Sequence, residues 1–170
     1  MALMDLAARI TRAPIPHEPD QGREAAAALP AGPLRDLAAG AAGCSPYLAG
    51  LLRREAEWAS AALAGPPEAA RDALLAEAEG IEGDPGAPLR RIKRRMALLV
   101  ALSDLGGAWP LETVTQALTD LADRAVEAAL SRALAREAAR GRLPDAPGAV
   151  ALAMGKMGGG SSTTPPTSTW

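Results

Sequence analysis

The sequence has few aromatic residues and few of the residues that build most catalytic and metal sites. Its 170 residues include no phenylalanine, one tyrosine, three tryptophans, one cysteine and one histidine. A single cysteine, Cys44, excludes an intrachain disulfide framework and favours a reducing compartment. A single histidine, His17, leaves Ser-His-Asp catalysis dependent on one residue and a His/Cys zinc site short of ligands. We therefore interpret both as ordinary loop or packing residues.

Long apolar runs and an excess of one charge are also missing. No run reaches the length of a transmembrane helix. The first residues carry Asp5, Arg9 and Arg12 where a signal peptide needs an apolar core. The formal net charge is −2, so no overall field attracts the chain to nucleic acid or anionic lipid. These features predict a cytoplasmic, soluble protein with neither nucleic acid nor membrane as a partner.

Alanine, leucine and arginine are abundant, and 17 glycines and 15 prolines separate the helix-forming stretches. Alanine and leucine favour helices, while β-branched and aromatic residues are scarce, so the composition predicts a mainly α fold. Apolar spacing and the Pro and Gly clusters divide the chain further. A short amphipathic stretch at 3–10 is followed by helices predicted over residues 21–29, 34–39, 46–64, 68–79, 89–105 and 110–140.

The last two of these helices have the strongest patterns. Gly106 and Gly107 end the first of them, Pro110 opens the second and Gly141 ends it, and so short a connection predicts antiparallel packing. On the longest helix we expect six residues to face the core: Leu111, Val114, Leu118, Leu121, Ala125 and Ala128. The basic run at 89–96 is interpreted as a solvated helix face rather than a phosphate or RNA patch, and Trp58 and Trp109 as packing residues.

Residues 149–154 are a short apolar run that leads into a glycine turn. This pattern predicts a buried strand entering the turn, although one strand cannot form a sheet by itself. The turn matches neither a P-loop nor a dinucleotide fingerprint, because Met157 replaces the P-loop hydroxyl and Ala153 replaces a required glycine. Its backbone amides are still suited to approach a phosphate. The candidate cofactor-binding residues are Gly155, Lys156, Gly158 and Gly159.

Several motifs together resemble one known family. The runs Leu89–Trp109 and Val114–Asp123 look like the signature helix pair of glutamine synthetase adenylyltransferase/adenylyl-removing enzymes. Cys44–Leu48, Met154–Gly159 and the opening Ala8–Pro16 are similar to the same proteins. The chain therefore resembles a member of this family up to the end of the glycine turn.

The resemblance implies an architecture and an activity. Family members carry two nucleotidyltransferase domains, and this segment is similar to the N-terminal, adenylyl-removing half, which releases adenylate from a tyrosine of glutamine synthetase by phosphorolysis. Residues 1–148 are then a helical region, and residues 149–159 are the first strand and glycine turn of a truncated nucleotidyltransferase domain with an α+β sheet. The resemblance also implies Mg²⁺, ATP, ADP and phosphate as cofactors of the intact enzyme. Its implied partners are glutamine synthetase and the PII signalling protein.

Residues 160–170 depart from the family pattern. In the family, the glycine turn is followed by Glu-Leu-Asn-Tyr-Ser-Ser-Asp-Ile-Asp-Leu, whose two aspartates bind magnesium. Here Asp145 is the only carboxylate side chain after Arg142, and the tail has no periodicity, so we expect it to be disordered. Codons for the tail can be chosen so that reading from the third base of the Gly160 codon encodes the family motif. We interpret the tail as that motif read out of frame.

Two functional hypotheses follow. In the first, the chain is a fragment of the bifunctional enzyme that has no catalytic or metal residues, needs no cofactor and is inactive. The alternative is a non-enzymatic helical protein-interaction module that is complete in itself.

Sequencing the gene and the DNA that follows it separates these hypotheses. We expect a second frame at codons 160–170 to encode Asp-x-Asp and to continue as a nucleotidyltransferase domain downstream. The interaction-module hypothesis predicts no such frame. If the second frame is absent, the frameshift hypothesis is contradicted.

Overall fold

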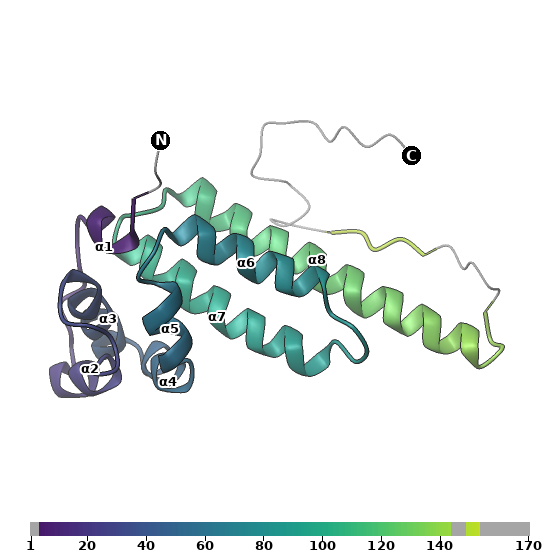
Figure 1. Ribbon diagram of the computed structural model, residues 1–170, viewed down its shortest axis with the longest axis horizontal. Coiled ribbons are helices and arrows are strands. Elements are labelled where there is room, and N and C mark those ends of the chain that lie inside the picture. The colour runs from purple at the N-terminus through teal and green to yellow at the C-terminus, as the bar shows by residue number, and fades with distance from the viewer. Residues whose placement is uncertain (1–3, 144–148, 154–170) are drawn as a thin grey trace.

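The computed structural model describes residues 4–143 and 149–153, and these residues form eight helices and no strand (Figure 1). The predicted mainly α fold is confirmed. The predicted glycine turn at 155–159 and the tail at 160–170 lie outside the described residues. The helices are α1 (Leu6–Arg9), α2 (Pro19–Ala25), α3 (Pro33–Cys44), α4 (Pro46–Arg54), α5 (Ala56–Ala62), α6 (Pro67–Glu79), α7 (Gly86–Leu105) and α8 (Leu111–Ala139).

The three longest helices lie along the long axis of the molecule. Figure 1 shows α6, α7 and α8 side by side, with α7 antiparallel to both of the others, and every pair of the three is in contact. The short helices α1 to α5 gather at the end where α7 meets α8, and both α3 and α4 pack on α7. The predicted antiparallel packing of the last two helices is confirmed.

The helix ends follow local chemistry that the sequence makes visible. Ser45 caps α4 by accepting a hydrogen bond from the backbone N–H of Leu48 at 3.3 Å, and Pro46 stands at the first helical position. Gly107, with a φ of 71°, lets the chain leave α7 in a left-handed conformation, and Gly141, with a φ of 69°, does the same after α8. Both helices therefore end at the glycines that the sequence predicts as their C-terminal caps.

The hydrophobic core is centred on α7. Ile92, Met96, Leu99 and Leu102 are all 0% exposed, at the spacing of one helix face. Leucines and alanines from the surrounding helices complete the core, and Trp109 is buried at 3% exposure. With no phenylalanine available, the core depends on aliphatic side chains and on close approach of helix backbones.

Several of the predicted helix boundaries are wrong. The helix predicted at 89–105 begins three residues earlier, at Gly86. The helix predicted at 34–39 runs on to Cys44, because Gly40 lies inside α3 and packs against another segment instead of ending the helix. The helix predicted at 46–64 is broken into α4 and α5 at Glu55, whose φ of −112° and ψ of 27° are not helical. The helix predicted at 21–29 begins at Pro19 and ends at Ala25, and residues 26–29 form turns.

Two of the predicted inward-facing residues on α8 are exposed. Leu111 is 68% exposed and Leu118 is 46% exposed, while the buried residues of this helix are Val114, Ala117 and Leu121. The side of α8 that meets α6 and α7 is therefore narrower than the apolar pattern predicts. The described part of the predicted strand, residues 149–153, has no regular secondary structure, and its apolar side chains are exposed.

Close backbone contacts at glycine hold α3 against the loop before α2, and α2 against α3. A Cβ atom on Gly40 would lie 2.3 Å from the carbonyl oxygen of Pro14, and one on Gly22 would lie 2.2 Å from that of Ala39. Such contacts fall far inside van der Waals distance, so a larger residue requires the backbone to move. Gly50 of α4, in contrast, has open space where its Cβ would be.

We expect Gly40→Ala to lower the free energy of unfolding by about 1–3 kcal/mol, since the methyl group forces α3 away from Pro14. The matched control, Gly50→Ala, removes a flexible residue from an exposed helix position and should raise stability by about 0.5–1 kcal/mol. Urea unfolding followed by circular dichroism measures both. A Gly40→Ala variant as stable as the original chain would contradict the contact.

Candidate functional site

The candidate cofactor-binding residues Gly155, Lys156, Gly158 and Gly159 lie outside the described residues, so their role stays a prediction. The other singled-out polar residues lie far from any constellation of reactive groups. The His17 side chain is 87% exposed beside Glu18. Cys44 is exposed, and its thiol donates to the carbonyl oxygen of Ile15. Within residues 4–143 and 149–153, no group of three His, Cys, Asp or Glu side chains is placed to hold a metal ion.

The basic run at 89–96 joins helices by ion pairs. Arg94 and Arg95 donate from Nε to the two carboxylate oxygens of Glu55, at 2.7 and 2.9 Å. Arg91 donates to Oε1 of Glu77 at 2.6 Å. Much of the positive charge of α7 is therefore neutralised within the protein, which leaves little of it for nucleic acid or phosphate.

Glu55 is the most deeply buried carboxylate in the described part of the chain, with a side chain that is 5% exposed. It occupies the break between α4 and α5, one helical turn after Leu52, at a position that the apolar spacing assigns to the core. Burial raises its pKa, but hydrogen bonds from Arg95 and Arg94 outweigh that effect, so its pKa lies below the ordinary value of 4.5. The Arg95 guanidinium also lies over the ring of Trp58, 5.6 Å from its centroid.

A second carboxylate, Glu68 at the start of α6, joins three distant segments. Arg9 donates to both of its oxygens, at 2.7 and 2.8 Å, and the indole Nε1 of Trp109 donates to Oε1 at 2.7 Å. Arg9 also donates to the carbonyl oxygen of Ala108 at 2.6 Å. Burial raises the pKa of Glu68, and the hydrogen bonds from Arg9, its own backbone N–H and Trp109 lower it below the ordinary value. These contacts fix α1, α6 and the α7–α8 turn together.

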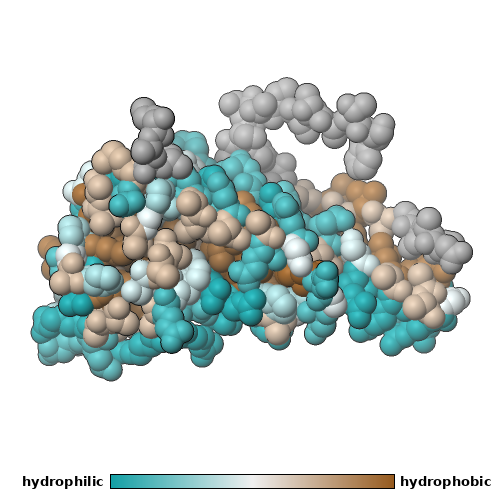
Figure 2. All heavy atoms as spheres, viewed as in Figure 1, coloured by the Kyte–Doolittle hydropathy of each residue, from teal (hydrophilic) through white to brown (hydrophobic). Residues whose placement is uncertain are grey.

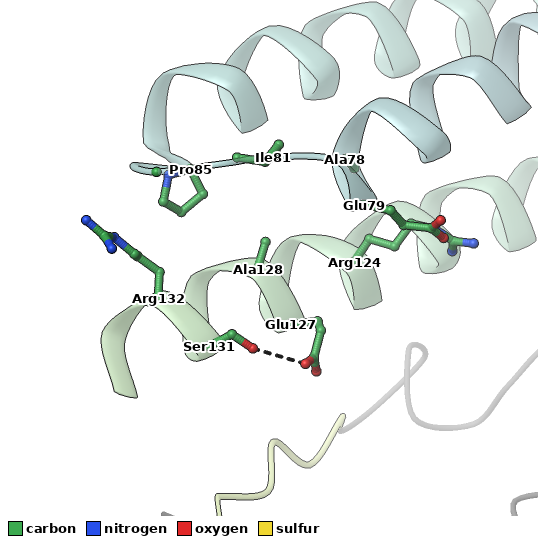
Figure 3. Close-up of a pocket in the computed structure, with 10 residues that line it drawn as sticks. Ala78, Glu79, Ile81, Pro85, Arg124, Glu127, Ala128, Ser131 and Arg132 are labelled. Atoms are coloured by element: carbon green, nitrogen blue, oxygen red, sulfur yellow. Dashed lines mark hydrogen bonds and ion pairs between the residues drawn. The ribbon is translucent and has the colours of Figure 1, made fainter. Parts of the chain in front are cut away.

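A cleft of about 510 Å³ lies between α8 and the loop that joins α6 to α7 (Figure 3). Ala78, Ile81, Pro85 and Ala128 give it an apolar lining. Four of its polar side chains pair with one another. Arg124 pairs with Glu79 at 2.7 Å, and the Ser131 hydroxyl donates to Glu127 at 3.1 Å.

A hollow of about 670 Å³ beside Glu55 includes Arg53, Arg54 and Trp58 in its lining. The Ser131–Glu127 hydrogen bond of the cleft lies on an exposed part of α8, and among the described residues neither this hollow nor the cleft has a metal-binding carboxylate set. Both are suited to packing or binding rather than to catalysis.

Comparison with known proteins identifies the family. Residues 37–161 match the family model of glutamate-ammonia ligase adenylyltransferase. The chain belongs to this adenylyltransferase family. The matched segment runs from within α3 through α8 and includes the predicted glycine turn.

The curated relatives have the same printed name, "bifunctional glutamine synthetase adenylyltransferase/adenylyl-removing enzyme". A protein of Rhodopseudomonas palustris is 47% identical over 130 residues, which are 68% of this chain and 13% of the relative. A Bradyrhizobium diazoefficiens protein is 44% identical over 140 residues, 74% of this chain and 14% of the relative. In another Rhodopseudomonas palustris strain, 40% identity extends over 91% of this chain and 19% of the relative. The chain thus spans less than a fifth of each of these adenylyltransferases, and no solved structure matches it.

Sequence reasoning missed both carboxylate clusters and the cleft of this family member. The Glu55 cluster has a signal in the sequence. A charged residue at a position predicted to face the core needs a partner of opposite charge, and the basic run at 89–96 can supply one. For Glu68 no local signal exists, because Arg9 and Trp109 are 59 and 41 positions away.

We expect Glu55→Gln to lower the free energy of unfolding by about 1–3 kcal/mol at neutral pH, because two charged hydrogen bonds lose their carboxylate. Since the folded-state pKa of Glu55 is lowered, its contribution is present above the ordinary value of 4.5 and is lost as the pH falls through the folded value. The stability difference between the two proteins should therefore shrink below that pH. Urea unfolding at pH 7 and at pH 4 or lower measures it.

The control is Glu57→Gln, which removes an exposed carboxylate two residues away and should change stability by less than about 0.5 kcal/mol. An equal effect of the two substitutions, or a Glu55 effect independent of pH, would contradict the buried ion pair.

Proposed function

We propose that this chain is the helical region that precedes the nucleotidyltransferase domain in the N-terminal, adenylyl-removing half of a bifunctional enzyme of nitrogen regulation. The observation that carries the proposal is the family match over residues 37–161, which continues from the described helices into the glycine turn. The names of the relatives support glutamine synthetase as the protein acted on. The PII signalling protein and a cytoplasmic location are part of the same proposal. Among the described residues, no helix is both long and apolar enough to cross a membrane.

The role of the helices is to support and position the segment that follows them. The Glu55 ion pairs hold the α4–α5 break on α7, and the Glu68 cluster holds α1 on α6 and on the α7–α8 turn. Helix α8 packs on α6 and α7 up to Leu121. In the intact enzyme we propose that α8 leads the chain towards the reaction centre, where residues 149–159 would lie. There the amides of Gly155, Gly158 and Gly159, together with Lys156, would approach the phosphates of the nucleotide.

The residues of this chain do not fit the magnesium ion of the family. Only Asp145 follows Arg142 as a carboxylate, and residues 160–170 contain none. We therefore propose that the 170-residue chain neither removes nor adds adenylyl groups, that it requires no nucleotide or metal, and that its tail is the out-of-frame form of the family motif.

Phosphorolysis tests this proposal. We expect the purified chain, mixed with adenylylated glutamine synthetase, phosphate and Mg²⁺, to form ADP no faster than a mixture without it, because no carboxylate pair holds the metal. The full-length Rhodopseudomonas palustris relative serves as the positive control. ADP formation by the chain above background would contradict the proposal. The same gene with its frame restored at codon 160 and its downstream DNA included should gain the activity.

A further inference from the structure

The last part of α8 and the turn after it hold an excess of positive charge. Residues 128–142 include four arginines and one glutamate, a net charge of +3, whereas the whole chain has a net charge of −2. Glu137 pairs with Arg140 and Arg142. Arg132 and Arg136 are exposed, and neither forms an ion pair within the part of the chain that the structure describes. Two guanidinium groups one helical turn apart therefore remain for a partner.

These arginines continue the line of α8 that packs on the core. The buried residues of this helix are Val114, Ala117 and Leu121. The same spacing of three and four residues leads through Ala125 and Ala128 to Arg132. Figure 1 shows that α8 here extends beyond the ends of α6 and α7. The side of α8 that packs on these two helices thus becomes a basic surface lined with alanine.

The cleft of Figure 3 lies where this basic surface begins. Its volume of about 510 Å³ is ample for an apolar side chain. Apolar residues line its middle: Ala128, Ile81 and Pro85. At one end Arg124 pairs with Glu79, and at the other end stands Arg132 (Figure 3). Glu127 points away from the apolar middle. The cleft thus places an apolar hollow next to a guanidinium that has no carboxylate partner among the described residues.

This combination favours an acidic helix of another protein as the occupant. A purely apolar partner would cover the guanidinium groups of Arg132 and Arg136 without pairing them, which costs free energy. Carboxylates three or four positions apart on a helix match two arginines at that spacing. The alanines beside these arginines let a second helix approach α8 closely. An apolar residue of that helix can then enter the cleft.

Two other kinds of partner fit less well. Nucleic acid offers phosphates to the arginines, but its backbone leaves the apolar middle of the cleft uncovered. An anionic membrane needs large apolar side chains that project into the lipid, whereas the apolar residues here are recessed in the cleft or are alanines. Figure 2 shows hydrophilic and hydrophobic surface next to each other at the projecting end of α8. An amphipathic protein surface is the better match.

We propose that Arg132, Arg136 and the cleft beside Ala128 form the docking site of an acidic amphipathic helix of a partner protein. The carboxylates of that helix pair with the two arginines, and one of its apolar side chains fills the space between Ala128, Ile81 and Pro85. Burial of the apolar contact supplies free energy, and the ion pairs set the orientation of the helix. The site lies within the described helices, so it does not depend on the proposed function.

Selection from a displayed library of random peptides of about 15 residues tests this site, with the 170-residue chain as the target. We expect the recovered peptides to carry carboxylates three or four positions apart beside an apolar residue, because that pattern matches the two arginines and the cleft. The affinity of a recovered peptide, measured by fluorescence anisotropy, should fall as salt is added, since salt screens ion pairs. Recovery of no peptide, or only of peptides without this pattern, would overturn the proposal.

Substitutions make the test specific. Arg132→Glu reverses the charge at the end of the cleft and Ala128→Gln fills its apolar middle, so each should weaken the binding of a recovered peptide by at least about tenfold. Arg54→Glu, a matched charge reversal at an exposed residue of α4, is the control and should leave the affinity unchanged. None of the three residues is buried, so thermal melting should stay close to that of the original chain. Equal weakening by Arg54→Glu and Arg132→Glu would indicate general charge attraction and overturn the proposal.

Other occupants give different results. Tighter binding of labelled single-stranded DNA or of phosphatidylserine vesicles than of the peptide, lost in Arg132→Glu, would assign the arginines to phosphate groups and overturn the proposal. A dimer in sedimentation that Arg132→Glu dissociates would assign the surface to a second copy, which also overturns it. The phosphorolysis assay is a separate readout. A chain that binds the peptide through Arg132 and also forms ADP would keep this docking site and contradict the proposed function.

Discussion

The arrangement of the helices depends on a carboxylate that connects segments far apart in the chain. Glu68 accepts hydrogen bonds from Arg9 and Trp109, which lie 59 and 41 positions away. Next to it, the N–H of Leu6 donates to the carbonyl oxygen of Gly65 at 3.0 Å, and that of Thr11 donates to Gly106 at 2.9 Å. The N-terminal segment is thereby tied to the start of α6 and to the α7–α8 turn, at one end of the three long helices. Because the α7–α8 turn is held there, the direction in which α8 projects is fixed as well.

The scarcity of aromatic side chains explains why backbone contacts matter so much elsewhere. Leucine and alanine fill less space than phenylalanine, so helices must approach closely to leave no cavity. Gly22, Gly40 and Gly43 permit this approach at the α2–α3 contact and against the loop of Pro14 and Pro16. A core of this kind tolerates little additional volume. The buried hydroxyl of Ser103, which has no hydrogen-bond partner among the described residues, is the exception to otherwise good polar pairing.

Local signals in the sequence were enough to predict the helical class and the presence of α6, α7 and α8. They also predicted the caps at Ser45, Gly107 and Gly141. They failed where a distant partner decides the structure. Gly40 has the usual signature of a helix end, yet it lies inside α3 because Pro14 packs on it. Glu55 continues an apolar spacing, yet it breaks the helix because Arg94 and Arg95 hold its carboxylate. The candidate glycine turn was predicted from its own residue pattern and is also part of the resemblance, and nothing in the described residues tests it.

Charged and apolar side chains play different parts in this helical region. Its buried carboxylates form ion pairs with arginines, several of them on α7, and these ion pairs hold the helices together. The charged residues left over are of both signs. Apolar side chains, in contrast, remain exposed on the projecting half of α8 and in the segment that follows. Since burial of apolar area is the main free energy available to such a surface, this half of α8 would be stabilised by any element that covers it.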